Sequence, residues 1–296
     1  MSEKQDWQGT WFDLEPKLSD PETARVTIIP APFEGSVSYG KGAAQGPYAL
    51  FQASRQVEFF EPELKINPCQ IGISSIPPLS LAGMPAKDAV EKVAEATRLV
   101  LSKGKKPVMI GGEHSLSFGS IKACREFFPD LAILHLDAHS DLRESYHGDP
   151  FSHASVMKRV FDAGIKFISA GIRSQCREEW ELIQANNLQI YYAYQLQKMS
   201  GWQELIARQL GENIYLTLDL DVFSPAELPG TGTPEPGGIG YYDLLKLFRA
   251  ISDSGKSIVG FDLVELAPIP DQQVSEFTAA RILYQMIGWF WARKIP

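Results

Sequence analysis

The chain has 296 residues, of which 36 are acidic, 28 are basic and 44% are hydrophobic. The formal net charge of −8 argues against a nucleic-acid partner and suits a small cationic ligand. A polar N-terminus predicts no signal peptide, and no apolar run is long enough to span a membrane. The scattered cysteines, Cys69, Cys124 and Cys176, favour a reducing compartment. We therefore expect a cytoplasmic protein without a membrane partner.

Short apolar runs alternate with amphipathic stretches along the whole chain. In order, they predict a strand at residues 26–29, helices at 47–57 and 87–102, a strand at 108–110, a helix at 115–128, and strands at 131–136 and 167–171. Next come helices at 177–185 and 203–210, a strand at 214–220, a helix at 242–252, a strand at 258–261 and a helix at 274–291. This alternation indicates a mostly parallel sheet with helices on both faces.

No linker, repeat or low-complexity tract divides the sequence. We expect a single domain over residues 1–296, with residues 1–23 as an N-terminal extension. In a sheet of this kind, ligands bind at the carboxyl ends of the strands. We therefore expect the catalytic and ligand-binding residues at these strand ends.

All five histidines lie between residues 114 and 153: His114, His135, His139, His147 and His153. His135 stands inside an apolar strand, and we interpret it as a buried core histidine. The segment that follows, Asp137-x-His139-x-Asp141, places two carboxylates and an imidazole on one face if the strand persists. Buried charges need a counter-charge, which indicates a cation, although a solvated acidic turn is the alternative.

Two further strand ends repeat this pattern. An apolar strand runs into Asp219 and Asp221, and a loop rich in glycine and proline follows at residues 222–234. Another strand ends in Gly-Gly-Glu-His, which places His114 just before a helix. The three strand ends together supply six candidate metal ligands: His114, Asp137, His139, Asp141, Asp219 and Asp221.

Oxygen and imidazole ligands in one set suit Mn²⁺. Six ligands exceed what one four-coordinate ion needs, so they indicate two ions about 3.5–4 Å apart. Such a pair lowers the pKa of a bridging water and makes hydroxide available near neutral pH. Four carboxylates neutralise two divalent ions, and the added hydroxide makes the site slightly anionic. A cationic electrophile is therefore favoured over a phosphate ester.

Four segments carry a resemblance to a known family: Gly-Gly-Glu-His-Ser at 111–115, Asp-Ala-His-Ser-Asp at 137–141, Asp-Leu-Asp with its Pro-Gly-Thr-Gly-Thr-Pro loop at 219–234, and Phe-Asp-Leu-Val-Glu-Leu-Ala-Pro at 261–268. In this order they resemble the ureohydrolases of the arginase/agmatinase family, from about residue 26 to near the C-terminus. The resemblance implies a three-layer α/β/α fold with a doubly wound sheet. It also implies two Mn²⁺ ions per chain and hydrolysis of a guanidinium group to urea.

The resemblance also implies roles for single residues. One ion would be bound by His114, Asp137, Asp141 and Asp219, and the other by Asp137, His139, Asp219 and Asp221. Asp137 and Asp219 would then bridge the two ions. Glu265 would hold the substrate guanidinium by charge-assisted hydrogen bonds, and a carboxylate without that role is the alternative. The catalytic histidine, which would protonate the leaving amine, corresponds to His153, with His147 as a rival alignment.

The substrate expectation rests on the loop at residues 142–149, which departs from arginases and looks like agmatinases. We expect hydrolysis of agmatine to putrescine, with Glu144 and Asp149 repelling a substrate carboxylate. Arg143 could bind such a carboxylate and His147 could contact substrate, so guanidino acids such as guanidinobutyrate stay open. A catalytically silent metal-binding paralogue is another alternative, and a metal-dependent deacetylase fits less well because it needs one metal only.

The family resemblance suggests a homo-oligomer, either a trimer or a hexamer. The aromatic run Trp289, Phe290 and Trp291 near the C-terminus could serve an interface or the core, and we interpret it as core.

Overall fold

The computed structural model describes residues 6–294 and contains one sheet of eight strands, all parallel. The strands are β1 (Val26–Ala31), β2 (Ile73–Ser75), β3 (Lys106–Gly111), β4 (Ala132–Leu136), β5 (Lys166–Ile172), β6 (Gln189–Tyr192), β7 (Asn213–Asp219) and β8 (Ser257–Val264). Across the sheet their order is β2-β1-β3-β8-β7-β4-β5-β6.

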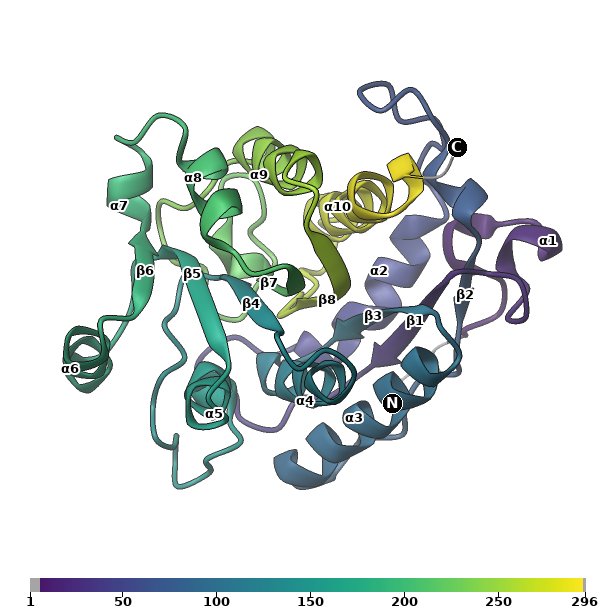
Figure 1. The fold of residues 1–296 in the computed structure, drawn as a ribbon. Coiled ribbons are helices and arrows are strands. Elements are labelled where there is room, and N and C mark those ends of the chain that lie inside the picture. Colours follow the sequence, from purple (N-terminus) through teal and green to yellow (C-terminus); the bar gives the residue numbers. More distant parts are fainter. Residues whose placement is uncertain (1–5, 295–296) are drawn as a thin grey trace.

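Helices cover both faces of this sheet (Figure 1). They are α1 (Pro16–Ser19), α2 (Gly46–Ser54), α3 (Ala86–Ser102), α4 (Ser117–Phe127), α5 (Val156–Asp162), α6 (Arg177–Asn186), α7 (Ala193–Leu196), α8 (Trp202–Gln209), α9 (Tyr241–Asp253) and α10 (Val274–Phe290). Helices α3, α4 and α5 lie on one face, and α2, α10, α9 and α8 lie side by side on the other. The expected three-layer α/β/α fold is confirmed.

The helices are held by the faces they bury. In α3 the buried stripe includes Val90, Val93, Thr97 and Val100, at helical spacing. Leu99 is 56% exposed because it lies off that stripe. Helix α10 is apolar on almost all sides because the sheet and neighbouring helices surround it.

The aromatic run at the end of α10 is buried within this chain: Trp289, Phe290 and Trp291 are 2%, 2% and 7% exposed. Its interpretation as core is confirmed. None of the helices in the described part of the chain is long and apolar enough to cross a membrane.

The sequence patterns did not predict β2, β6 or α5. Strands β2 and β6 are short and form the two edges of the sheet, where a strand needs few buried side chains. Helix α5 has only seven residues, which is too few for its apolar spacing to stand out from the surrounding loop.

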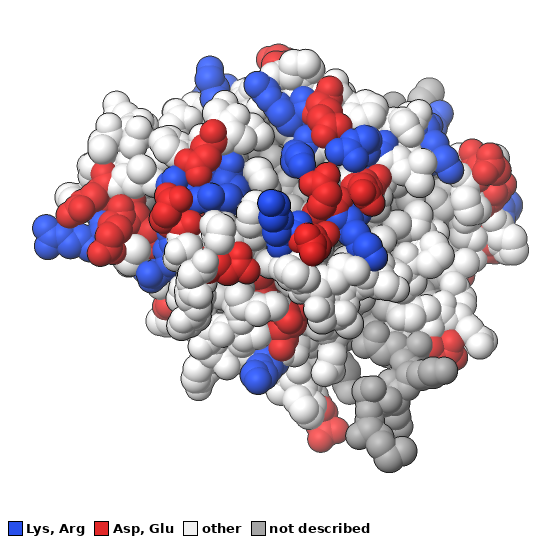
Figure 2. Space-filling model, turned by 90° about the horizontal axis from the view of Figure 1, so that it is seen from below, with Lys and Arg blue, Asp and Glu red and all other residues white. Residues whose placement is uncertain are grey.

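Charged side chains of both signs are interspersed on the face seen in Figure 2. Helices α3 and α4, at the bottom of Figure 1, are joined by the ion pairs Arg98–Glu126 at 2.8 Å and Lys122–Glu91 at 2.6 Å. All four of these side chains are partly exposed, so each pair contributes little to stability. Where these pairs form, the surface carries mixed charge and not a basic stripe.

Strand register places the chemistry at one edge of the sheet. Strands β3, β8, β7 and β4 are the central four, and the paired residues Ile110, Leu263, Leu218 and Leu136 form one row across them. Because all strands run the same way, the segments that follow this row leave the sheet on the same side. These are the segments that carry the motifs found in the sequence.

Candidate metal centre and substrate pocket

The imidazole of His114 is the centre of the first group of candidate ligands. Its Nδ1 lies 3.1 Å from Asp137 Oδ2, 3.1 Å from Asp141 Oδ2 and 3.2 Å from Asp219 Oδ2. The ring is 1% exposed. Within residues 6–294, Nδ1 nevertheless has no partner with hydrogen-bond geometry. A buried nitrogen facing three carboxylate oxygens in this way fits a site for a cation.

His139 is the centre of the second group. Its Nδ1 lies 2.9 Å from Asp221 Oδ2 and 3.6 Å from Asp137 Oδ1. Asp137 thus contributes one oxygen to each group, as a carboxylate between two ions does. Asp219 contacts the first group through Oδ2, while its Oδ1 accepts a hydrogen bond from the Asp221 N–H at 2.8 Å. That Asp219 also bridges stays a prediction.

Electrostatics favour cations at this position. Burial and the neighbouring carboxylates of Asp221 and Asp137 raise the pKa of Asp219 well above its usual range. Burial and Asp137 likewise raise the pKa of Asp221. A divalent ion would offset this repulsion, and oxygen with imidazole ligands is the set that Mn²⁺ accepts. The residues present therefore fit a pair of divalent ions.

His135 is fully buried beneath the first group, as its position in β4 predicted. Its Nδ1 lies 2.9 Å from Ser169 Oγ, and its Nε2 lies 2.8 Å from Asp137 Oδ2. The ring is therefore satisfied, and it also fixes the orientation of Asp137.

A buried chain of hydrogen bonds behind His114 was missed from the sequence. The Thr217 hydroxyl donates to Asp262 Oδ1 at 2.7 Å, and the Tyr215 hydroxyl donates to Asp262 Oδ2 at 2.8 Å. Because the Thr217 proton points to Asp262, its oxygen accepts from His114 Nε2, 2.9 Å away. The proton of the neutral ring is then on Nε2, which leaves the Nδ1 lone pair for a metal. Thr217 and Asp262 each stand among apolar residues within a strand, and that contrast was the feature of the sequence that could have revealed them.

Glu265 directly follows β8 and has a left-handed backbone, with φ of 63°. Its N–H donates to the Gly112 carbonyl at 2.8 Å, and its Oε1 accepts from the His114 N–H at 2.6 Å. Burial and the charge of Glu113 raise the pKa of Glu265 to about 8. A cationic group beside the carboxylate would reverse this rise.

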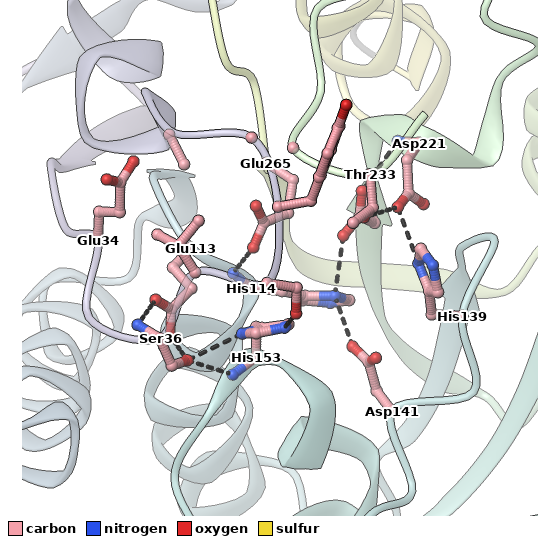
Figure 3. A pocket seen from close by; sticks show the side chains of 17 residues that line it. Glu34, Ser36, Glu113, His114, His139, Asp141, His153, Asp221, Thr233 and Glu265 are labelled. Atoms are coloured by element: carbon pink, nitrogen blue, oxygen red, sulfur yellow. Dashed lines mark hydrogen bonds and ion pairs between the residues drawn. The ribbon is translucent and has the colours of Figure 1, made fainter. Parts of the chain in front are cut away.

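One pocket joins these residues, and we call it the inner pocket. It is lined by the two histidines and three of the aspartates above, by Glu265, and by Glu34, Ser36, Ser38, Glu113 and His153 among others (Figure 3). Part of its wall is the loop at residues 34–42, which two residues separate from the end of β1. A Cβ on Gly40 would lie 2.8 Å from the Gly232 carbonyl oxygen, so glycine permits this loop to meet the loop after β7.

Glu113 fastens the start of the 34–42 loop. Its carboxylate accepts hydrogen bonds from the backbone N–H groups of Gly35 and Ser36 and from the hydroxyls of Ser36 and Ser115. Ser36 Oγ in turn lies 2.8 Å from His153 Nδ1, and Ser38 Oγ lies 2.8 Å from His153 Nε2. The sequence singled out His153 but missed these partners, which are more than a hundred residues away along the chain.

The two candidate catalytic histidines differ in position. His153 lines the inner pocket. His147 is exposed, has a φ of 50°, packs against the Tyr146 ring at 4.2 Å and is not among the residues that line the pocket. The structure thus brings His153, and not His147, to the other site residues.

The loop at residues 142–149 is placed differently from expectation. Glu144 pairs with Lys158 at 2.8 Å and with Arg159 at 3.3 Å, and Asp149 accepts from the Phe151 N–H, so neither faces the inner pocket. Their expected repulsion of a substrate carboxylate is therefore not supported. Arg143 lines an outer pocket with Tyr146 and Gln175, and its guanidinium lies 5.8 Å from the Tyr146 ring centre. This outer pocket adjoins the inner pocket, since His139, Asp141 and His153 line both.

Arg173, just after β5, was also missed. Its guanidinium donates to six backbone carbonyls, those of Gly171, Asp221, Val222, Phe223, Glu235 and Pro236, at 2.7–3.4 Å. It thereby holds the segment after β7, and Asp221 with it, against the end of β5. An arginine that directly follows a strand gives no such signal in sequence.

Comparison with known proteins agrees with this geometry. Residues 24–288 match the Arginase family. The chain is 37% identical to an N(1)-aminopropylagmatine ureohydrolase from Synechocystis, covering 90% of this chain and 89% of that one. It is 35% identical to an agmatinase from Bacillus anthracis, covering 90% and 93%. The crystal structure of agmatine ureohydrolase of Thermoplasma volcanium superposes with a TM-score of 0.81 at 30% identity, covering 90% of each chain. The chain therefore belongs to the arginase family.

Proposed function

We propose that this chain, a ureohydrolase of the arginase family, uses two Mn²⁺ ions to hydrolyse agmatine to putrescine and urea. The observation that carries the proposal is the buried His114 Nδ1, which faces three carboxylate oxygens beside a second group built on His139. One ion would be held by His114, Asp137, Asp141 and Asp219, and the other by Asp137, His139, Asp219 and Asp221. Two divalent ions bound there would lower the pKa of water and supply the nucleophile at neutral pH.

Glu265 positions the substrate in this proposal. Its Oε1 is engaged by the His114 N–H, so Oε2 is the oxygen that accepts from the guanidinium N–H groups. A charge-assisted pair of this kind would hold the central carbon beside the metal ligands, because Glu265 and those ligands line the same pocket (Figure 3). Water adds to that carbon, the bond to the alkyl-bearing nitrogen breaks, and urea and the free amine result.

His153 supplies the proton for the leaving amine in this proposal. The Ser36 hydroxyl donates to Glu113, so its oxygen accepts from Nδ1–H of His153. The network therefore keeps one proton on Nδ1, so the proton that is transferred is the second proton of the imidazolium, on Nε2, where exposed Ser38 lies. Glu113 and Ser36 act through this ring and are positioning residues, while Nε2 is the atom that delivers the proton.

The substrate assignment is supported by charge. The inner pocket is lined by six carboxylate residues, and within the described chain no lysine or arginine lines it. A guanidino acid whose carboxylate met this wall would find no cationic partner there, because Arg143 lies in the adjoining outer pocket. N(1)-aminopropylagmatine is a second candidate substrate, because relatives named for it match this chain at 32–37% identity.

Steady-state urea release from a panel of guanidines tests the proposal. The panel contains agmatine, N(1)-aminopropylagmatine, arginine and 4-guanidinobutyrate, with Mn²⁺ present. We expect agmatine to have the highest kcat/KM, and about 10³-fold or more above arginine, because an unpaired buried carboxylate costs several kcal/mol. A higher value for the aminopropyl compound would reassign the substrate, and no urea from any of them would reject the proposal.

We also propose that the chain acts in the cytoplasm as a homo-oligomer, a trimer or a hexamer, and that residues 1–296 form one domain. Its three cysteines are free, which suits a reducing compartment. The aromatic run at the end of α10 is buried within the chain, so a subunit interface would use other residues.

A further inference from the structure

The carboxylates that line the inner pocket can be matched with partners one by one. Asp141, Asp219 and Asp221 face the candidate metal ligands His114 and His139. Glu113 accepts four hydrogen bonds from the loop beside it and from Ser115. Glu265 accepts from the His114 N–H and is the proposed guanidinium partner. Glu34 is the carboxylate that this matching leaves over.

Glu34 has one engaged oxygen and one free oxygen. Its Oε2 accepts a hydrogen bond from the Gly42 N–H at 2.6 Å, which closes the 34–42 loop. Oε1 has no hydrogen bond or ion pair within the described residues, and Glu34 is only partly exposed. A carboxylate that lines a pocket, is held by one oxygen and has the other oxygen unengaged is well prepared to receive a cationic donor.

The position of Glu34 suits the far end of a substrate. Figure 3 shows Glu34 on one side of Glu265, and Asp221 with His139 on the other. A guanidinium held by Glu265 beside the metal ligands can therefore direct its alkyl chain toward Glu34. The other direction leads to the outer pocket, where Arg143 would repel a second cation.

We propose that Glu34 binds the ammonium group at the far end of the substrate and so selects guanidines that carry a second positive charge. This inference rests on the proposed function and extends it to a specificity residue. Agmatine and N(1)-aminopropylagmatine both carry an amine nitrogen one butyl chain away from the guanidinium. Arginine would bring a carboxylate together with its ammonium group toward Glu34, and guanidinobutyrate would bring a carboxylate alone.

A purely structural role for Glu34 predicts a different result. If the side chain only closes the loop onto Gly42, the variant Glu34→Gln keeps that function, because the amide oxygen still accepts the Gly42 N–H. The variant removes the negative charge and little else. A purely structural role therefore predicts no change with any substrate. A role in binding the ammonium group predicts a loss only with substrates that carry that group.

The experiment compares agmatine with n-butylguanidine, which has the same chain and no amine. For Glu34→Gln we expect kcat/KM for agmatine to fall by about 10–100-fold, mainly through KM, because a hydrogen bond to a charged group is lost. For butylguanidine we expect a change of less than about 2-fold. Glu144→Gln is the matched control: it removes the same charge from an exposed side chain that pairs with Lys158 and Arg159, and both substrates should be unaffected.

Three results would overturn the inference. Equal losses for the two substrates would show that the charge of Glu34 acts on the pocket as a whole and not on the ammonium group. Unchanged kinetics with agmatine would show that the ammonium binds elsewhere. A wild-type preference for guanidinobutyrate would point to Arg143 as the partner of the far end, while urea chemistry stands. If the wild type released no urea from any guanidine, the proposed function itself would fail.

Discussion

The metal-ligand end of the inner pocket stands on four adjacent strands, whereas the opposite wall consists of loops held together by hydrogen bonds. His114 and Asp137 follow strands β3 and β4, and Asp219 ends β7, so all three lie just beyond or at the paired ends of adjacent strands. Ser36 and Ser38 instead reach His153 across 117 and 115 residues of chain. The first region is fixed by the sheet, and the second depends on a few buried acceptors such as Glu113. The proposed metal ligands thus lie on the rigid part, and the residues proposed to recognise the substrate lie on the adaptable part.

The largest loss of activity should follow from a substitution of Asp137, whose carboxylate contributes to both groups of candidate ligands. Asp137→Asn should lower kcat by at least about 10³-fold, because a carboxylate that serves two ions is lost and several kcal/mol of stabilisation go with it. Metal analysis of the dialysed protein should show that both ions are lost. Asp219→Asn should behave similarly if Asp219 bridges as well. Retention of two ions per chain by either variant would contradict the assignment of that residue as a bridge.

On the opposite wall of the pocket, which consists of loops, we expect a substitution to lower kcat without loss of metal. His153→Asn should lower kcat by about 10²–10⁴-fold, because the proton donor is removed, while both ions stay bound. His147→Asn is the matched control and should change kcat little, since His147 lies outside the pocket. Urea release and metal content are measured on the same preparations. The reverse ranking of the two histidines would mean that the loop carrying them has been interpreted incorrectly.

A smaller effect, on Mn²⁺ affinity, is expected from Thr217, which contacts the ring of His114 from within β7. Thr217→Val removes the oxygen that accepts from His114 Nε2 and leaves the ring free to place its proton on Nδ1. Mn²⁺ affinity at the His114 site should fall by about 10–100-fold, as for other outer partners of ligating histidines. Thr217→Ser keeps the hydroxyl and should restore it. Equal Mn²⁺ affinity in all three proteins, measured by calorimetric titration, would show that Thr217 only packs in the core.

The same contrast explains what could be predicted from the sequence. Ligands such as Asp137 and Asp221 stood out because an apolar strand running into alternating charges is costly unless something compensates it. The α/β class followed from the alternation of apolar strands and amphipathic helices, and only short elements such as β2 and β6 escaped. These features depend on neighbours within a few residues, so they are visible in a single sequence.

The loop wall could not be predicted in the same way. Glu34 and Ser36 look like ordinary loop residues, and their positions become clear only when Glu113 and His153 are brought beside them. Glu144 misled for the same reason, because its partners Lys158 and Arg159 lie on a helix that the sequence did not reveal. Thr217 and Asp262 are buried polar residues whose role depends on the adjacent strand.

The central claim is that two ions and an acidic pocket together hydrolyse a dicationic guanidine. Its most direct test is a Mn²⁺ titration of the chelator-treated protein, with urea release from agmatine measured at each step. The account predicts that activity saturates at two Mn²⁺ per chain and is absent without metal. Full activity at one ion per chain, or urea release that does not depend on metal, would contradict it.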